Sequence, residues 1–168
     1  MYGIASKEIP VLKDVSKQIS NMSAAPGGKR IVFEARGELF DVPVKDGYIA
    51  NLTNSSGAFD RNPSWSPNGE KVAYWSDSSG ENEIHMYDVK SRVSSKMTSI
   101  ESGFGYRLHW SPNNEKISFI DEKNDIQILD VGSKTLEKID NVYLNVGHGS
   151  RFGFTISWSP DSKWIAYN

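Results

Sequence analysis

Apolar residues occur along the chain in short runs, and clusters of Gly, Pro, Asn, Asp and Ser separate these runs. In the run 71–76 the neighbours Val72, Ala73, Tyr74 and Trp75 are all apolar. Because successive strand residues face opposite sides of a sheet, such a run predicts a strand whose sheet is covered on both faces. No stretch shows the periodicity of an amphipathic helix. The pattern therefore predicts an all-β protein.

One longer pattern occurs four times. It reads SAAPGGKRIVF (23–33), SWSPNGEKVAY (64–74), HWSPNNEKISF (109–119) and SWSPDSKWIAY (157–167). Its prolines, Pro26, Pro67, Pro112 and Pro160, are separated by 41, 45 and 48 residues. Proline fixes φ and the following Gly or Asn tolerates a positive φ, so each copy predicts two strands joined by a tight turn. Repeats of this length that are rich in short strands are typical of β-propeller blades.

The remaining strands complete four-stranded blades. Third strands are expected at 39–42, 84–89 and 126–131, and more polar outer strands near 49–53, 96–99 and 136–139. The fold predicted is a partial β-propeller of about three and a half blades, with blade repeats at about 15–54, 62–99 and 106–141 and an incomplete blade at 154–168. The segment 1–14 could supply the outer strand of a neighbouring blade. An open β-sandwich also has many short strands, but it does not repeat one pattern at a nearly constant interval.

Six residues define the repeat and are interpreted as structural: Trp65, Pro67, Trp110, Pro112, Trp158 and Pro160. The first copy departs from the pattern, since Ala24-Ala25 replaces the Trp-Ser pair. The fourth copy reaches Asn168 directly after its second strand. We therefore expect the chain to be cut from a larger protein. Its end blades would be covered by the remaining domains of that parent, or by a second copy that completes a ring of about eight blades.

Charge and composition restrict the classes of partner. The formal net charge is −2, without the excess of Lys and Arg that binding to nucleic acid or to a membrane surface requires. No apolar run reaches the roughly 18 residues of a membrane span. The absence of cysteine excludes disulfides, thiol catalysis and cysteine-bound zinc within these residues.

The phrase FEARGELF at 33–40, followed by VP (42–43) and NLT (51–53), is more particular than the turn motif. Together with the segments 28–89, 103–121 and 154–167 it resembles the propeller region of the tricorn protease family. The resemblance implies a large peptidase with two propellers, a PDZ-like module and a serine-protease domain, in which this chain would begin the second, seven-bladed propeller.

The resemblance also implies a role. Propellers of this family admit and guide peptides rather than cut them, and the family's catalytic Ser and His lie in regions that this chain does not contain. We therefore expect a non-catalytic scaffold and gate for peptide entry. The alternative is a stand-alone or TolB-like protein-binding propeller without hydrolase activity, and a third reading places the chain before a prolyl-oligopeptidase domain. The expected location is cytoplasmic, or periplasmic if the parent carries a signal sequence.

The sequence shows no pattern that is typical of a catalytic, metal or cofactor site. The histidines His85, His109 and His148 fall in different repeats, so neither a metal site nor a cofactor is predicted. The segment 147–150, Gly-His-Gly-Ser, lacks the Gly-x-Ser-x-Gly pattern of a nucleophile elbow. No catalytic residue is therefore predicted.

Three connections between blades, 55–63, 101–108 and 141–155, each carry aromatic and cationic residues. They supply the candidate channel-lining peptide contacts Phe59, Arg61, Phe104, Tyr106, Arg107, His148, Arg151 and Phe152. Arginine offers paired donors to carboxylates and aromatic rings offer apolar contact, which suits extended peptides. The alternative is that these arginines form ion pairs with nearby acids such as Asp60 and stabilise the loops.

Overall fold

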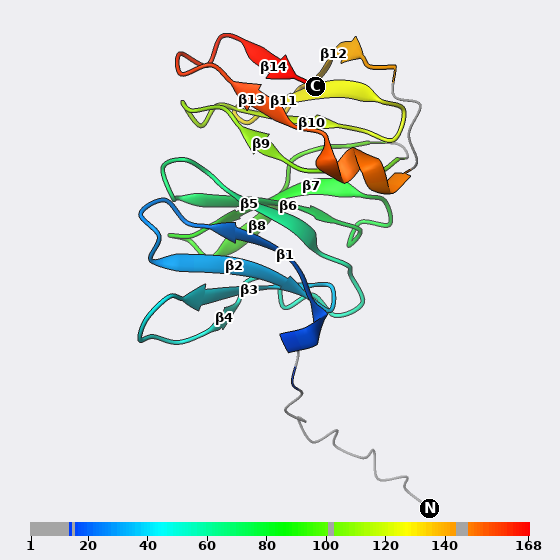
Figure 1. The fold of residues 1–168 in the computed structure, drawn as a ribbon. Coiled ribbons are helices and arrows are strands. Elements are labelled where there is room, and N and C mark those ends of the chain that lie inside the picture. The colour runs from blue at the N-terminus through cyan, green and yellow to red at the C-terminus, as the bar shows by residue number, and fades with distance from the viewer. Residues whose placement is uncertain (1–13, 15, 101–102, 144–147) are drawn as a thin grey trace, which may run out of the picture.

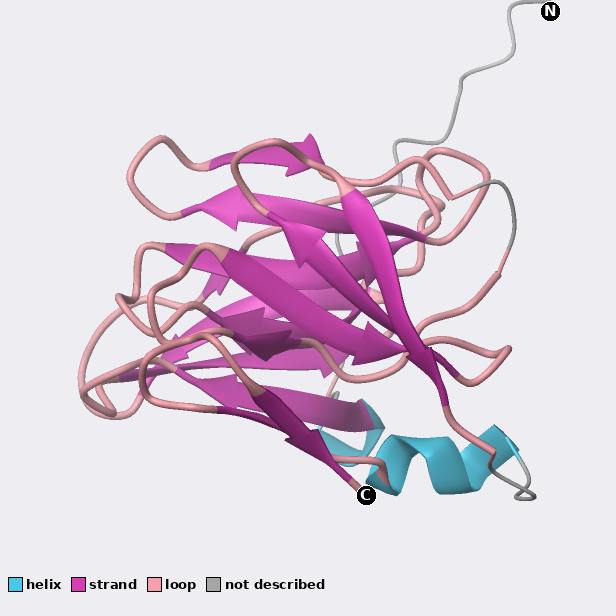
Figure 2. Ribbon diagram, turned by 90° about the horizontal axis from the view of Figure 1, so that it is seen from above, coloured by secondary structure: helices cyan, strands magenta, loops and turns pink. Residues whose placement is uncertain are grey.

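The structure is a computed structural model, which describes residues 14, 16–100, 103–143 and 148–168. The segment 1–13, predicted as part of an outer strand, lies outside the described residues. The prediction of an all-β fold made of four-stranded antiparallel sheets is confirmed. Strands make up nearly all of the regular structure in Figure 2. The helical segments found in these described ranges are the short 3-10 helices η1 (Ser16–Gln18) and η2 (His148–Gly153).

The sheets follow one another along the chain, and each strand pairs with the next. Blade 1 comprises β1 (Ile19–Ala24), β2 (Arg30–Ala35), β3 (Glu38–Pro43) and β4 (Ala50–Asn51). Blade 2 comprises β5 (Arg61–Trp65), β6 (Lys71–Ser76), β7 (Glu83–Asp88) and β8 (Val93–Lys96). Blade 3 comprises β9 (His109–Trp110), β10 (Lys116–Ile120), β11 (Asp125–Asp130) and β12 (Leu136–Asn141). A two-stranded sheet of β13 (Ile156–Trp158) and β14 (Ile165–Tyr167) follows. Figure 1 shows the four sheets stacked in chain order.

The outer strands differ from the prediction in their bounds. The second was expected at 96–99, but β8 covers Val93–Lys96. Met97 and Thr98, which follow it, are buried because Met97 enters the core and the Thr98 hydroxyl donates to the carboxylate of Glu83 at 2.5 Å. The polar appearance of the segment therefore reflected a buried hydrogen bond as well as an exposed strand.

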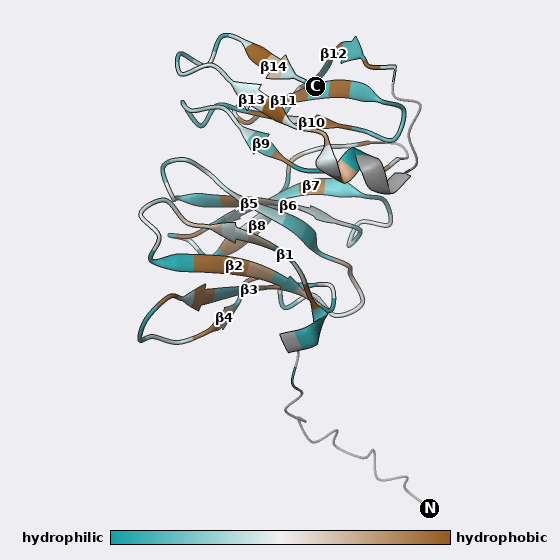
Figure 3. Cartoon of the chain, in the orientation of Figure 1, coloured by the Kyte–Doolittle hydropathy of each residue, from teal (hydrophilic) through white to brown (hydrophobic). Residues whose placement is uncertain are grey.

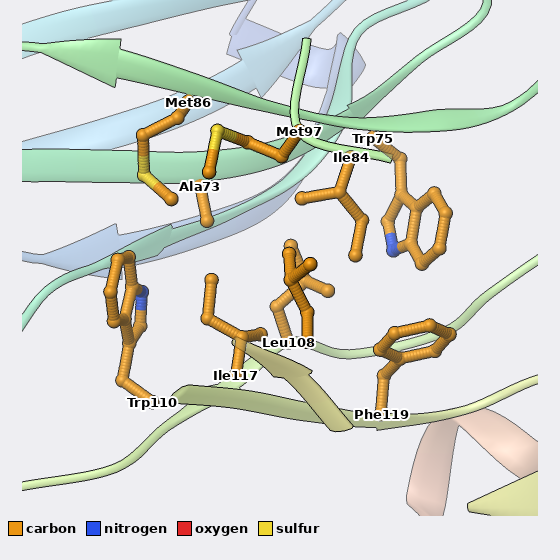
Figure 4. Packing of buried hydrophobic residues seen from close by; sticks show 10 residues of the cluster. Ala73, Trp75, Ile84, Met86, Met97, Leu108, Trp110, Ile117 and Phe119 are labelled. Carbon is orange, nitrogen blue, oxygen red and sulfur yellow. The ribbon is translucent and has the colours of Figure 1, made fainter. Parts of the chain in front are cut away.

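The core lies between the sheets, as a strand apolar on both sides requires. Val72 and Tyr74 of β6 pack toward blade 1 with Val32 and Leu39, whereas Ala73 and Trp75 pack toward blade 3. Figure 4 shows the second interface, where Ala73 and Trp75 approach Trp110, Ile117 and Phe119. Figure 3 shows the matching apolar band along β2. Burying a Val, Leu, Ile or Phe side chain such as Val72, Leu39 or Phe119 contributes about 1.5–3 kcal/mol.

Two of the repeated tryptophans, Trp110 and Trp158, also link the blades through hydrogen bonds. The Trp110 indole Nε1 donates to the Ser64 carbonyl of blade 2 at 3.1 Å, and the Trp158 indole donates to the His109 carbonyl of blade 3 at 3.1 Å. Each indole thus bonds the inner strand of the preceding blade. These bonds account for Trp at the end of the first strand in these two copies of the repeat.

Candidate binding groove at the inner strands

The inner strands β1, β5 and β9 form one edge of their sheets, because each pairs with a neighbour on one side only. An open groove of about 450 Å³ crosses all three strands. It is lined by Ser20, Asn21, Met22, Ser23, Asn62, Pro63, Ser64, Arg107, Leu108 and His109. Most of these side chains are polar, so the groove offers hydrogen-bonding groups in a row across three blades.

A buried carboxylate holds β1 and β5 at the groove. Glu34 on β2 is buried, and it accepts hydrogen bonds from the Ser20 hydroxyl at 2.8 Å and the Asn21 amide at 2.6 Å. The same carboxylate accepts the backbone N–H of Asn62 at 2.9 Å. These three donors compensate for the cost of burying the charge. Glu34 therefore fixes the spacing of two groove strands.

Arg107 is the cation of the groove. Its side chain is exposed, while the next residue, Leu108, is buried in the core between blades 2 and 3 and anchors the segment. His109 follows and is partly buried. Burial, and to a lesser degree the charge of Arg107, lower the pKa of His109 below its usual value. The imidazole is therefore neutral at pH 7, so it can both donate and accept hydrogen bonds.

Three of the predicted contact residues form an aromatic cluster instead of a channel surface. Phe104, Tyr106 and Phe152 pack edge to face, with centroids 5.0 Å apart for the pairs of Tyr106 with Phe104 and with Phe152. Tyr106 is fully buried in the core between blade 3 and the two-stranded sheet. Phe104 and Phe152 are partly buried against the same core. The cluster therefore holds the loops that carry Phe104 and Phe152 against this core.

Two arginines that were predicted as peptide contacts, Arg61 and Arg151, donate hydrogen bonds to asparagine side chains instead. Arg61 lies over the Phe104 ring, 4.0 Å from the centroid, and donates to the Asn82 side chain at 2.5 Å. Burial lowers the pKa of Arg61, and the charges of Glu34 and Asp77 oppose this shift. The Nε of Arg151 donates to the Asn124 side chain at 2.6 Å. Both arginines therefore stabilise loops, through asparagine amides rather than the predicted carboxylate of Asp60.

Two predicted contacts remain. Phe59 is about half exposed, and its backbone N–H donates to the Asp77 carboxylate at 2.6 Å. His148 lies in η2, and its side chain is outside the described residues. Of the seven candidates whose side chains are described, the structure brings Arg107 alone into the groove. The inner-strand residues Ser20, Asn21, Asn62 and Ser64 were missed, although polar residues just before each repeated Trp position were a visible signal.

Within the described ranges, no three His, Asp or Glu side chains gather where a metal ion could be held. The helices found in the same ranges are too short and polar to span a membrane.

Comparisons with known proteins support the fold. No family model matches the sequence, and no curated protein sequence does. Among solved structures, the tricorn protease matches with a TM-score of 0.71 and 18% identity over 95% of this chain and 15% of that chain. TolB from Acinetobacter baumannii matches with a TM-score of 0.65 and 21% identity over 86% of this chain and 36% of that chain. A putative TolB from Agrobacterium tumefaciens matches with a TM-score of 0.65 and 18% identity over 87% and 57%.

These similarities define the class of protein: the chain is a segment of β-propeller with four-stranded blades. It spans about a third of the A. baumannii TolB chain and a smaller part of tricorn protease. At these identities the comparisons show a fold that is shared by the two kinds of protein.

Proposed function

We propose that this propeller segment binds extended polypeptide in the groove at its inner strands and performs no catalysis itself. The observation that carries the proposal is the groove across β1, β5 and β9 with the exposed guanidinium of Arg107. An extended chain offers carbonyl and amide groups at regular spacing, which the serine, asparagine and histidine side chains of the groove can bind. Arg107 favours peptides that present a carboxylate.

Within a tricorn-like serine peptidase, such a groove would act as scaffold and gate on the path of the substrate. The FEARGELF phrase of the sequence and the structural match to tricorn protease support this role. The structural matches to TolB support a second candidate, a protein-binding propeller without a hydrolase domain. Both roles use the same groove, and they differ in what the parent protein does with the bound chain.

The binding step is tested with a fluorescent, unstructured acidic peptide of about ten residues, whose anisotropy is followed as chain 1–168 is added. Arg107→Ala should weaken binding by about tenfold, because one charge-assisted hydrogen bond contributes about 1.5–3 kcal/mol. Lys90→Ala removes an exposed cation away from the groove and is the matched control. Equal binding by the wild-type and Arg107→Ala chains would contradict the proposal.

Experiments on the parent protein distinguish the role of a peptidase gate from that of a protein-binding propeller. Sequencing the gene beyond the codon for Asn168 shows whether a serine-protease domain follows. If it does, Arg107→Ala should slow the turnover of long peptides and spare short ones, whereas Arg151→Ala should act mainly on loop stability because its guanidinium is bonded to Asn124. Equal slowing of long and short peptides would argue against a gate.

A further inference from the structure

A second cavity, of about 420 Å³, lies between blades 1 and 2, away from the inner strands. It is lined by Arg30, Asp41, Tyr48, Ala50, Asn51, Leu52, Trp65, Tyr87, Val89 and Arg92. These residues come from β2, β3, β4 and the residues that flank β4 in blade 1, and from β5, β7 and the β7–β8 turn in blade 2. The two sheets face one another in Figure 1. Two residues in it depart from their equivalents in the other blades.

The first is Trp65. The equivalent indoles of Trp110 and Trp158 donate to carbonyls of the preceding blade, each at 3.1 Å. Trp65 is only 8% exposed, and its buried Nε1 has no hydrogen-bond partner among the described residues. A buried donor in this state has lost its hydrogen bond to water without gaining another. At this junction the repeat tryptophan fills the core without making its usual link.

The second is Asp41. At the same repeat position, Asp88 and Asp130 each accept hydrogen bonds from a serine three residues later, Ser91 and Ser133. The residue three positions after Asp41 is a valine. Asp41 is 9% exposed, and its Oδ2 accepts from the Arg30 Nε at 2.6 Å. Its Oδ1 is buried, and no donor to it is found in the part of the chain that the structure describes.

The rim of the cavity adds a cation and apolar surface. Arg92 is exposed and donates to the Tyr48 hydroxyl at 3.3 Å, and Tyr48 is itself 62% exposed. Leu52 and Tyr87 belong to the apolar side, where they pack in the core between blades 1 and 2. A matching ligand therefore needs an acceptor for the indole, a donor for Asp41, an anion for Arg92 and an apolar group.

We propose that this interblade cavity binds an N-acylated amino acid through its carboxylate, its amide and its side chain. Trp65 Nε1 and Asp41 Oδ1 are both buried, so the cavity must open slightly on binding; the acyl carbonyl then accepts the Trp65 indole N–H, and the amide N–H donates to Asp41 Oδ1. The carboxylate pairs with Arg92, and an apolar side chain lies against Leu52 and Tyr87. The same chemistry is present in a free N-acyl amino acid and at the carboxyl-terminal residue of a peptide.

The indole N–H signals in proton–nitrogen NMR test the proposal directly. The chain has five tryptophans, and Trp65→Phe identifies the Trp65 signal by its loss. The probes are N-acetyl-leucine, its neutral analogue N-acetyl-leucinamide, and an acetylated hexapeptide that ends in leucine. N-acetyl-leucine should shift the Trp65 signal and leave those of Trp110 and Trp158 in place. Tighter binding of the hexapeptide would identify the peptide terminus as the source, and tighter binding of N-acetyl-leucine would identify the free compound.

Variants then assign the contacts. Trp65→Phe keeps the ring and removes the N–H, and Arg92→Gln removes the charge; each should weaken binding of N-acetyl-leucine about tenfold. Arg107→Ala, in the other groove, should leave this binding unchanged. The two proposals therefore fail independently. Absence of any Trp65 shift at millimolar N-acetyl-leucine, or equal affinity for the leucinamide, would overturn the proposal.

Discussion

Gly105 lies in the loop that carries Phe104, Tyr106 and Arg107, where the backbone packs closely against the Trp75 ring. Its substitution by alanine tests that packing. A Cβ built on Gly105 would lie 2.0 Å from Cζ2 of Trp75, far inside ordinary van der Waals contact. The close approach is with a side chain that is almost completely buried. The Gly105→Ala variant therefore requires the Trp75 ring or the loop to move.

Two interactions oppose that movement. The Trp75 indole donates to the Tyr106 carbonyl at 2.7 Å, and its ring packs edge to face on Phe119 with centroids 5.1 Å apart. Overpacking costs about 1–3 kcal/mol, and loss of the hydrogen bond adds about 1 kcal/mol or more. We expect Gly105→Ala to lower the free energy of unfolding by about 3 kcal/mol. With a urea slope of about 2 kcal/mol per molar, the unfolding midpoint falls by about 1.5 M.

The assay is urea unfolding followed by tryptophan fluorescence and circular dichroism. Gly153→Ala is the matched control, because a Cβ there meets nothing within 4 Å, and its midpoint should stay close to that of the wild type. In a double-mutant cycle, Gly105→Ala should cost much less stability in the Trp75→Phe background, because phenylalanine lacks the outer indole atoms that the new Cβ would approach. A Gly105→Ala midpoint equal to that of Gly153→Ala would refute the reasoning.

Three further predictions concern stability and association. Glu34→Ala removes the acceptor of the Asn62 N–H and of two side chains, so it should cost about 3 kcal/mol in urea unfolding; a cost below about 1 kcal/mol would show that the carboxylate is dispensable. Burial lowers the pKa values of His85 and His109, so the unfolded chain binds more protons, and stability should fall as pH drops below about 6.5; His109→Gln should reduce this dependence in pH-dependent thermal unfolding. The face of blade 1 that carries the partly exposed Phe33 packs on no other sheet among the described residues, and β14 pairs with no strand there other than β13. Chain 1–168 should therefore self-associate at micromolar concentration, and light scattering that gives a monomer mass would contradict this.

The sequence predicted the blades because each level of its pattern agrees: turn chemistry, strand alternation and repeat length all indicate the same sheet. It did not predict which residues would face the groove. Aromatic and arginine residues in the loops suggested a channel surface, but Tyr106 is buried and Arg61 lies against Phe104. Sequence spacing alone does not distinguish an aromatic ring that packs under a loop from one that lies on it.

The repeat also contains acidic residues whose structural role was not predicted. The third strand of each full blade begins with an acid, and the three acids, Glu38, Glu83 and Asp125, accept hydrogen bonds from Asn51, Thr98 and Asn141. They therefore join the third strand to the outer strand or to the residues just after it. Two of the acids are buried or nearly so, and this could be inferred only once their partners in the outer segments were placed.

The tryptophan links between blades have a direction. Trp110 needs the inner strand of blade 2 as its acceptor, and Trp158 needs that of blade 3, so each link reaches back to a part of the chain that is synthesised earlier. A blade leaving the ribosome therefore meets an acceptor that is already available, and its own inner strand becomes the acceptor for the blade that follows. The order of translation and the order of docking coincide, which shortens the time during which an apolar sheet face is exposed in the cell.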